Sequence, residues 1–217
     1  MVIRAVVFDC DGVLVDSEPH SAAAWVAVLG SRGHRATTAD VADCTGLGYT
    51  ATYEHLAAVD PSVALPPPEA LWPEVHAALA ASFDRGLEVF ADAAACVTYL
   101  AFAGVPLAVA SSSRRERLDL TLEHSGLGRY FAVAASGDEV EHGKPAPDVY
   151  LLAAERLGVP PEDCLAVEDT GHGAASAVAA GMRVVGVARN PAEAGRLLGA
   201  GAALVNRLDP WVLRTLL

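Results

Sequence analysis

The first run of apolar residues, at positions 5–8, has the length of a buried β-strand and stops abruptly at two acids. Asp9 and Asp11 stand two positions apart, and Gly12 follows, where the backbone can turn tightly. In an extended chain this spacing puts both carboxylates on one side, about 7 Å apart. Because two such anions repel each other, the pattern favours a divalent cation such as Mg²⁺ between them. Solvated acids at a strand end would give the same spacing.

Residues 17–85 contain no strand-like apolar run, so they are expected to form an all-helical insertion. Its helices are predicted at 19–29, from Thr38 for a short run, at 50–58 and at 69–85. The segments 15–17 and 85–86 are predicted to be the hinges of this insertion.

After residue 86 the pattern changes to an alternation of helices and buried strands. Strands are predicted at 105–110, 131–135, 164–167, 183–187 and 202–205, and helices at 91–102, 114–125, 148–157 and 174–180. This alternation predicts an α/β fold with a doubly wound parallel sheet and right-handed crossovers. Residues 1–16 and 86–217 would then form a Rossmann-like catalytic core, and 17–85 an inserted helical cap domain.

Residues able to carry chemistry follow several of the predicted strands. Asp9, Ser111 and the pair Glu168 and Asp169 each come directly after a strand, and Lys144 stands in a loop after another. Ligands of parallel sheets bind beyond the carboxyl ends of the strands, so we expect these residues to share one site. Ser111 could also cap the following helix, a role that is compatible with binding an anion at the helix N-terminus.

Composition narrows the class of partner. The 217 residues are 53% hydrophobic and 19% charged, and the net charge is −12, which indicates an ample core and no disorder. Nucleic acids and anionic membranes bind clustered Lys and Arg, so neither is expected as a partner, and no obligate protein partner is predicted. The first apolar run ends at Asp9, which is too early for a signal peptide. No run of about 18 apolar residues is present, so no membrane-spanning helix is expected. The four cysteines include no CxxC pair, which is the spacing typical of zinc or redox sites. We therefore expect a cytoplasmic protein with reduced thiols.

Lys144 is the single lysine of the chain, whereas fourteen arginines are present. This usage indicates a coding bias that places Arg wherever either cation would serve. A position that keeps Lys against this bias is expected to need a compact ammonium rather than a planar guanidinium, although one lysine can also survive by chance.

Four stretches resemble, in the expected order, the motifs of one family. FDCDGVLVDSE at 8–18 resembles the first motif of the haloacid dehalogenase-like (HAD) superfamily, in the subgroup of small phosphatases and β-phosphoglucomutases. VASSS at 109–113 resembles the second motif, GKPAPDVY at 143–150 the third, and VEDTGHGAASAVAAGM at 167–182 the fourth. The resemblance covers nearly the whole chain and implies that residues 17–85 form a mobile cap over the site.

The resemblance also implies a role for each motif residue. Asp9 would be the nucleophile and Asp11 the general acid and base, Ser111 would hydrogen-bond the transferring phosphoryl group, and Lys144 would neutralise its charge. The implied Mg²⁺ ligands are Asp9, the backbone carbonyl of Asp11, Asp169 and, directly or through water, Glu168. The set is physically coherent, because an anionic nucleophile that approaches a phosphate dianion needs its charge cancelled.

Asp11 distinguishes between the reactions of the superfamily that this chain resembles, because true haloacid dehalogenases carry a non-acidic residue at its position. Phosphoryl transfer is therefore expected. A phosphomutase would need cap cations for a second phosphate, but residues 17–85 contain no lysine, and the segment 47–49 lacks the Arg that β-phosphoglucomutases place there. We expect a phosphatase that acts on a sugar or polyol phosphate. A phosphomutase is the alternative, and an inactive metabolite-binding module is less favoured. The predicted substrate-binding residues are Gly12, Glu18, Trp25, Leu47, Gly48, Tyr49 and Ser112.

Overall fold

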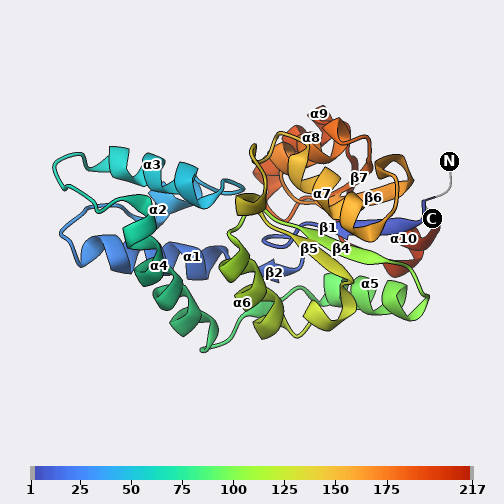
Figure 1. Cartoon of the computed structure of the whole chain (residues 1–217), viewed down its shortest axis with the longest axis horizontal. Coiled ribbons are helices and arrows are strands. Elements are labelled where there is room, and N and C mark those ends of the chain that lie inside the picture. Colours follow the sequence, from blue (N-terminus) through green and yellow to red (C-terminus); the bar gives the residue numbers. More distant parts are fainter. Residues whose placement is uncertain (1–2, 216–217) are drawn as a thin grey trace.

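A computed structural model of the chain describes residues 3–215 and places a helical insertion at one end of a layered α/β core (Figure 1). Six parallel strands of the core lie side by side in the order β5-β4-β1-β6-β7-β8. They are β1 (Ala5–Phe8), β4 (Leu107–Ala110), β5 (Val133–Ala135), β6 (Cys164–Glu168), β7 (Arg183–Val187) and β8 (Ala203–Val205). The chain runs outward from β1 to β5 and then returns to the other side of β1 at β6. This reversal of strand order beside β1 is where such sheets bind ligands.

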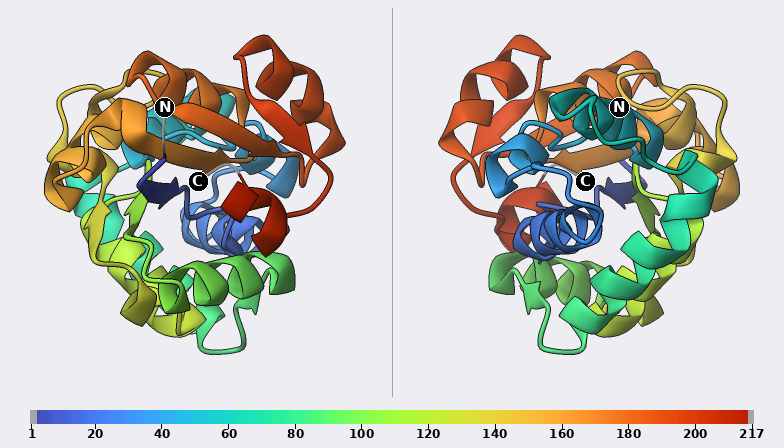
Figure 2. Two further views of the ribbon diagram at one scale, coloured as in Figure 1. Left: turned by 90° about the vertical axis from the view of Figure 1, so that its right-hand side faces the viewer. Right: turned by 90° about the vertical axis from the view of Figure 1, so that its left-hand side faces the viewer.

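The residues of β1 point alternately into two apolar cores, because successive side chains of a strand face opposite sides. Val6 and Phe8 belong to one core, together with helices α5 (Ala91–Phe102), α6 (Arg115–Ser125) and α10 (Pro210–Thr215). Ala5 and Val7 belong to the other, together with α7 (Asp148–Leu157), α8 (Gly171–Ala179) and α9 (Ala194–Gly199). Figure 2 shows the sheet between these two helical layers. Since every residue of β1 is fully buried, the strand holds the following Asp9 on a rigid support.

The insertion lies between two short strands, β2 (Val15–Asp16) and β3 (Glu88–Val89), which pair antiparallel. It contains α1 (Glu18–Gly30), α2 (Thr38–Ala42), α3 (Tyr49–Val59) and α4 (Pro68–Phe83). These helices have an apolar core of their own, which includes Trp25, Leu29 and Leu56. The chain therefore enters and leaves the insertion through neighbouring strands, while the insertion packs largely on itself.

The predicted α/β fold class is confirmed, and the predicted strands and longer helices lie within a few residues of the observed ones. The helix predicted at 174–180 begins earlier, at Gly171, because the side chain of Thr170 caps it by accepting a hydrogen bond from the backbone of Gly173. Several short elements were not predicted from the sequence. They are β2, β3, α9, α10 and the 3₁₀ helices Gly128–Tyr130, Gly137–Glu139, Pro161–Asp163 and Pro191–Glu193. Elements this short contain too few residues to show a period.

The four cysteines are buried and none forms a disulfide, in agreement with the expected reduced thiols. Among the helices of residues 3–215, none is both long enough and apolar enough to cross a membrane.

Candidate active site

Lys144 lies between two carboxylates at the carboxyl ends of β1 and β6. Its Nζ donates to Asp9 Oδ1 and to Glu168 Oε1, each at 2.6 Å, and to the backbone oxygen of Ala110 at 3.1 Å. Its side chain is 3% exposed. Burial lowers the pKa of Lys144, but the two carboxylates outweigh burial and hold this pKa above its ordinary value. The lysine is therefore a fixed positive charge beside Asp9.

Glu168 anchors this lysine. Its Oε1 also accepts a hydrogen bond from the hydroxyl of Tyr150 at 2.8 Å, and its Oε2 accepts from the backbone nitrogens of Asp169 and Thr170. Both oxygens of the fully buried Glu168 are thus already bonded within the protein. Such saturation suits a residue that fixes the position of Lys144.

Asp169 adds a third carboxylate to Asp9 and Glu168, and together they form a group that could hold a metal ion. Oxygens of Asp9, Glu168 and Asp169 lie within 4.8 Å of one another. Asp169 Oδ1 is buried and has no hydrogen-bond partner among the described residues. Burial and the neighbouring carboxylates raise the pKa of Asp169 well above its usual range, and burial raises the pKa of Asp9 to about 7. Three clustered acids with an unpaired oxygen fit a hard divalent cation such as Mg²⁺.

Gly12 lets the β1 loop pass close to Asp169. The residue has a φ of +85°, and a Cβ built on it would collide with the Asp169 carboxylate. Side chains larger than hydrogen are disfavoured at such a φ even where space is free.

A pair of substitutions separates these two effects. Gly104 has a similar φ of +76° with nothing within 4 Å of a built Cβ, so Gly104→Ala is expected to cost about 1–2 kcal/mol of unfolding free energy. Gly12→Ala adds the collision and is expected to cost about 3 kcal/mol or more. Chemical denaturation of both variants checks this, and equal losses would show that Asp169 is free to move aside.

Asp11 is held at both of its oxygens. Ser17 Oγ donates a hydrogen bond to Oδ1, Arg117 Nη2 lies 3.3 Å from the same oxygen, and Ser113 Oγ donates to Oδ2 at 2.9 Å. Burial raises the pKa of Asp11, but the charge of Arg117 and the hydroxyl hydrogen bonds outweigh it, and the pKa lies below its ordinary value. In the substrate-free protein these groups favour the ionised carboxylate, and they fix its direction.

A cavity connects these polar groups with the helical insertion. Ser111, which is 1% exposed and accepts a hydrogen bond from the backbone of Ser113, lies in its wall. The predicted site residues in the wall are Asp9, Asp11, Glu18, Trp25, Leu47, Tyr49, Ser111, Ser112, Lys144 and Asp169. The structure thus brings most of the predicted residues to one cavity.

Three predicted residues contribute to the site without being in this wall. Gly12 adjoins Asp169, Glu168 binds Lys144, and Gly48 approaches the backbone oxygen of Ser112, which would lie 3.3 Å from a Cβ at Gly48. His20 of α1 is not in this wall, and its Nδ1 contacts the hydroxyl of Ser82 at 2.8 Å.

The insertion contributes an aromatic wall that is tied to the core by Arg114. Trp25 stacks on Tyr49 with ring centroids 5.5 Å apart, and Trp72 meets Tyr49 edge-on at 4.9 Å. The guanidinium of Arg114 lies over the rings of Tyr49 and Trp72 and forms two hydrogen bonds of 2.9 Å with Glu69 of α4. The cavity is therefore closed on this side by contacts between the N-terminus of α6 and the insertion.

The site residues that sequence reasoning missed include Arg114, Arg117 and Tyr150. The segment 114–125 was predicted as a helix, and no role in the site was assigned to its arginines. The helical period does indicate that Arg117 faces the core side of the helix, because it is adjacent to Leu118 and four positions before Thr121, both of which are buried. Tyr150 is the last residue of the third motif and lies in α7, but nothing in the sequence shows that its hydroxyl reaches Glu168 at the end of β6.

Comparison with protein families matches residues 3–181 to the model of haloacid dehalogenase-like hydrolases. The chain is similar to the Arabidopsis thaliana protein SUPPRESSOR OF QUENCHING 1, chloroplastic, at 35% identity over 210 residues, which is 94% of this chain and 19% of that protein. It is also similar to the fructose-1-phosphate phosphatase YqaB of Escherichia coli K12, at 33% identity over 182 residues, which covers 83% of this chain and 94% of that one.

Among solved structures, the chain is similar to CbbY from Rhodobacter sphaeroides in complex with phosphate. The TM-score is 0.79 at 25% sequence identity, and 95% of each chain is covered. The similarity extends over the sheet and the helical insertion together.

Proposed function

The chain belongs to the haloacid dehalogenase-like hydrolase family, and from this membership we propose that it is a Mg²⁺-dependent phosphatase of a sugar or polyol phosphate that forms an aspartyl-phosphate on Asp9. Its place among phosphatases of this family makes it a phosphoric monoester hydrolase. The observation that carries the proposal is the position of Asp9, which lines the cavity beside the fixed charge of Lys144 and within the acidic cluster.

The chemistry follows from the residues around Asp9. A carboxylate oxygen of Asp9 attacks the phosphorus and the bond from phosphorus to the alcohol oxygen breaks. Asp11, which has to carry a proton at this step, donates it to the alcohol oxygen. Water then attacks the phosphorus of the aspartyl-phosphate, Asp11 takes a proton from this water, and the bond from phosphorus to the Asp9 oxygen breaks, which releases phosphate. Ser111 hydrogen-bonds the phosphoryl group and Lys144 neutralises its charge during both steps. Mg²⁺ held by Asp9, Asp169, Glu168 and the Asp11 carbonyl would supply charge neutralisation.

The charges around the cavity favour a phosphatase over a phosphomutase. Among the described residues of the cavity wall, three are cations, and each already has an anionic partner. Lys144 pairs with Asp9, Arg117 with Asp11, and Arg114 with Glu69. None is left for the second phosphate of a bisphosphate, so a neutral polyhydroxy leaving group suits the remaining space better. Glu18, Ser21 and Thr45 offer polar atoms for its hydroxyls.

We also propose that residues 17–85 act as a cap over a catalytic core formed by 1–16 and 86–217. The separate apolar core of the insertion and the contacts of Arg114 with α4 support this division. A cap of this kind would exclude water from the cavity when substrate is bound.

A screen of sugar and polyol monophosphates, read by release of inorganic phosphate, tests the function. We expect turnover of at least one of them, and no conversion of β-glucose 1-phosphate to glucose 6-phosphate. Conversion of the sugar phosphate without release of inorganic phosphate would show that the protein is a phosphomutase rather than a phosphatase. Binding of the phosphates without either reaction would indicate an inactive metabolite-binding module.

The metal requirement gives a second test. We expect activity to be lost with a chelator, restored by Mg²⁺, and inhibited by Ca²⁺, because Ca²⁺ takes more ligands at longer distances and would loosen the geometry around Asp9. Isothermal titration of the chelated protein with Mg²⁺ provides a readout that does not depend on turnover, and Asp169→Asn is expected to weaken that binding about tenfold or more. Full activity in metal-free buffer would contradict the assignment.

A further inference from the structure

Arg117 is a partly buried cation of the cavity wall that belongs to none of the four motifs. We infer that it is a positioning residue, which holds the Asp11 carboxylate in the direction needed to exchange a proton with the substrate oxygen and with water. The inference rests on the proposed phosphatase function, in which Asp11 handles this proton. Arg117 itself is assigned no contact with the transferring phosphoryl group.

The contacts of Arg117 converge on one side of Asp11. Its Nη2 lies 3.3 Å from Asp11 Oδ1 and 3.4 Å from Ser17 Oγ, and its Nη1 lies 3.4 Å from Ser21 Oγ. Ser17 Oγ in turn donates a hydrogen bond to the same Oδ1. The guanidinium therefore orients both the carboxylate and the hydroxyl that binds it.

The other oxygen of Asp11 is bound from a different element, because Ser113 Oγ donates to Oδ2 at 2.9 Å. Rotation of the carboxylate about its Cβ–Cγ bond would disturb hydrogen bonds at both oxygens. Arg117 is the cationic partner of Asp11, and its charge adds an electrostatic restraint to the hydrogen bonds of the two hydroxyls. Without it, Asp11 would keep two hydroxyl partners and gain freedom to turn.

Packing alone does not explain an arginine at this position. The side chain of Arg117 is 19% exposed, and its Nε is buried without a hydrogen-bond partner among the described residues. Burying a guanidinium is costly unless it is well paired, and an apolar residue would continue the buried face formed by Leu118 and Leu122. The energetic cost of burying the Arg117 guanidinium is accounted for if its charge orients Asp11.

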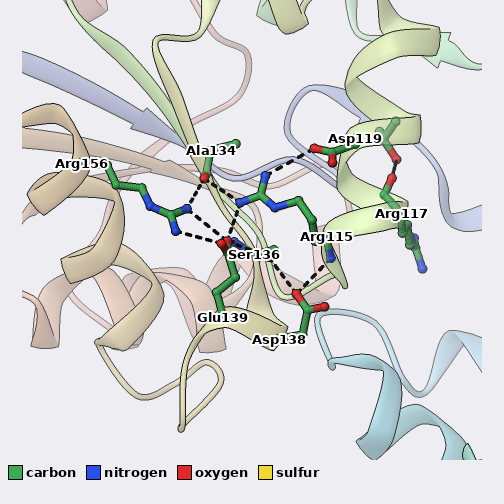
Figure 3. A network of polar contacts seen from close by, with 9 residues as sticks. Arg115, Arg117, Asp119, Ala134, Ser136, Asp138, Glu139 and Arg156 are labelled. Carbon is green, nitrogen blue, oxygen red and sulfur yellow. Dashed lines mark hydrogen bonds and ion pairs between the residues drawn. The ribbon is translucent and has the colours of Figure 1, made fainter. Parts of the chain in front are cut away.

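Arg115, two residues earlier on the same helix, provides a natural comparison. Figure 3 shows its side chain directed to Glu139 and to the backbone oxygen of Ala134, whereas Arg117 points away from this network. Arg115 is also absent from the cavity wall. Removal of the Arg115 side chain changes the net charge and the α6 surface as removal of Arg117 does, but it leaves the contacts of Asp11 in place.

The test compares leaving groups. In Arg117→Met, kcat/KM for the best alkyl phosphate of the screen is expected to fall about 10- to 100-fold, because an alkoxide needs a well-placed proton donor. For 4-nitrophenyl phosphate, whose leaving group needs little protonation, it is expected to stay within about threefold of wild type. Arg115→Met is expected to change both values by the same factor, and Arg117→Lys to recover part of the alkyl-phosphate loss. An equal loss on both substrates in Arg117→Met would reduce Arg117 to a structural role.

A double-substitution cycle then asks whether Arg117 acts through Asp11. With the alkyl phosphate, Asp11→Asn combined with Arg117→Met is expected to be no slower than Asp11→Asn alone, within about twofold. Multiplied losses would overturn the inference. If wild type releases phosphate but Arg117→Met is unimpaired, the inference fails while the phosphatase stands. If wild type hydrolyses neither substrate, the proposed function itself fails, and the inference that rests on it fails too.

Discussion

The Asp9→Asn variant is expected to release phosphate at less than about a thousandth of the wild-type rate while it keeps its fold. The amide has nearly the same shape as the carboxylate, but it is a poor nucleophile. It also removes one of the two anions that lie 2.6 Å from Lys144. Both effects act on the reacting centre, so this is the largest loss of activity that we predict.

Thermal unfolding of the same variant in chelator separates lost chemistry from misfolding. Burial and Glu168 disfavour the charged form of Asp9, as its pKa of about 7 indicates, so a neutral amide relieves repulsion within the acidic cluster. We expect the midpoint of unfolding to be unchanged or higher than that of wild type. Asp119→Asn, at an exposed acid paired with Arg115, serves as a control with normal activity. Near-normal turnover by Asp9→Asn would end the covalent mechanism.

The second large effect concerns the single lysine. Lys144→Arg is expected to lower kcat on the order of 100-fold or more, although it keeps the positive charge. The ammonium of Lys144 fits among Asp9 Oδ1, Glu168 Oε1 and the Ala110 oxygen at 2.6, 2.6 and 3.1 Å. A planar guanidinium is broader, so it would displace Asp9 or leave the fully buried Glu168 poorly paired.

Comparison with Lys144→Ala, which is expected to be at least as damaging, separates geometry from charge. If charge alone mattered, Lys144→Arg would be close to wild type. Circular dichroism and thermal unfolding of both variants exclude misfolding as the cause. Retention of more than about a third of wild-type turnover by Lys144→Arg would show that the compact ammonium is not required, and that one lysine in the composition is accidental.

Buried strands and their polar ends were the most predictable parts of the molecule. The run at 5–8 is apolar at every position because β1 is covered on both faces, and its end at Asp9 is visible in the sequence. Placing Asp9, Lys144 and Asp169 at one edge then required only the rule for parallel sheets. Their catalytic roles stay predictions.

The parts that escaped prediction depend on contacts between distant segments. Arg117 meets Asp11 across 106 positions, and Trp72 donates to Glu116 across 44. The spacing of neighbouring residues in the sequence does not indicate which distant residues come into contact. The two-residue strands β2 and β3 were missed for a related reason, since each is defined by its pairing with the other rather than by a pattern of its own.

The pairing of β2 with β3 has a mechanical consequence. Val15 is opposite Val89 and Asp16 is opposite Glu88, so the two chain crossings between core and insertion are joined side by side. Two independent flexible tethers would let the insertion tumble in several directions. A joined pair removes most of these degrees of freedom and leaves rotation about one short axis as the easy motion. If the insertion opens and closes as the proposed cap, it can return to the same position over Asp9 each time, with little conformational entropy lost in finding that position.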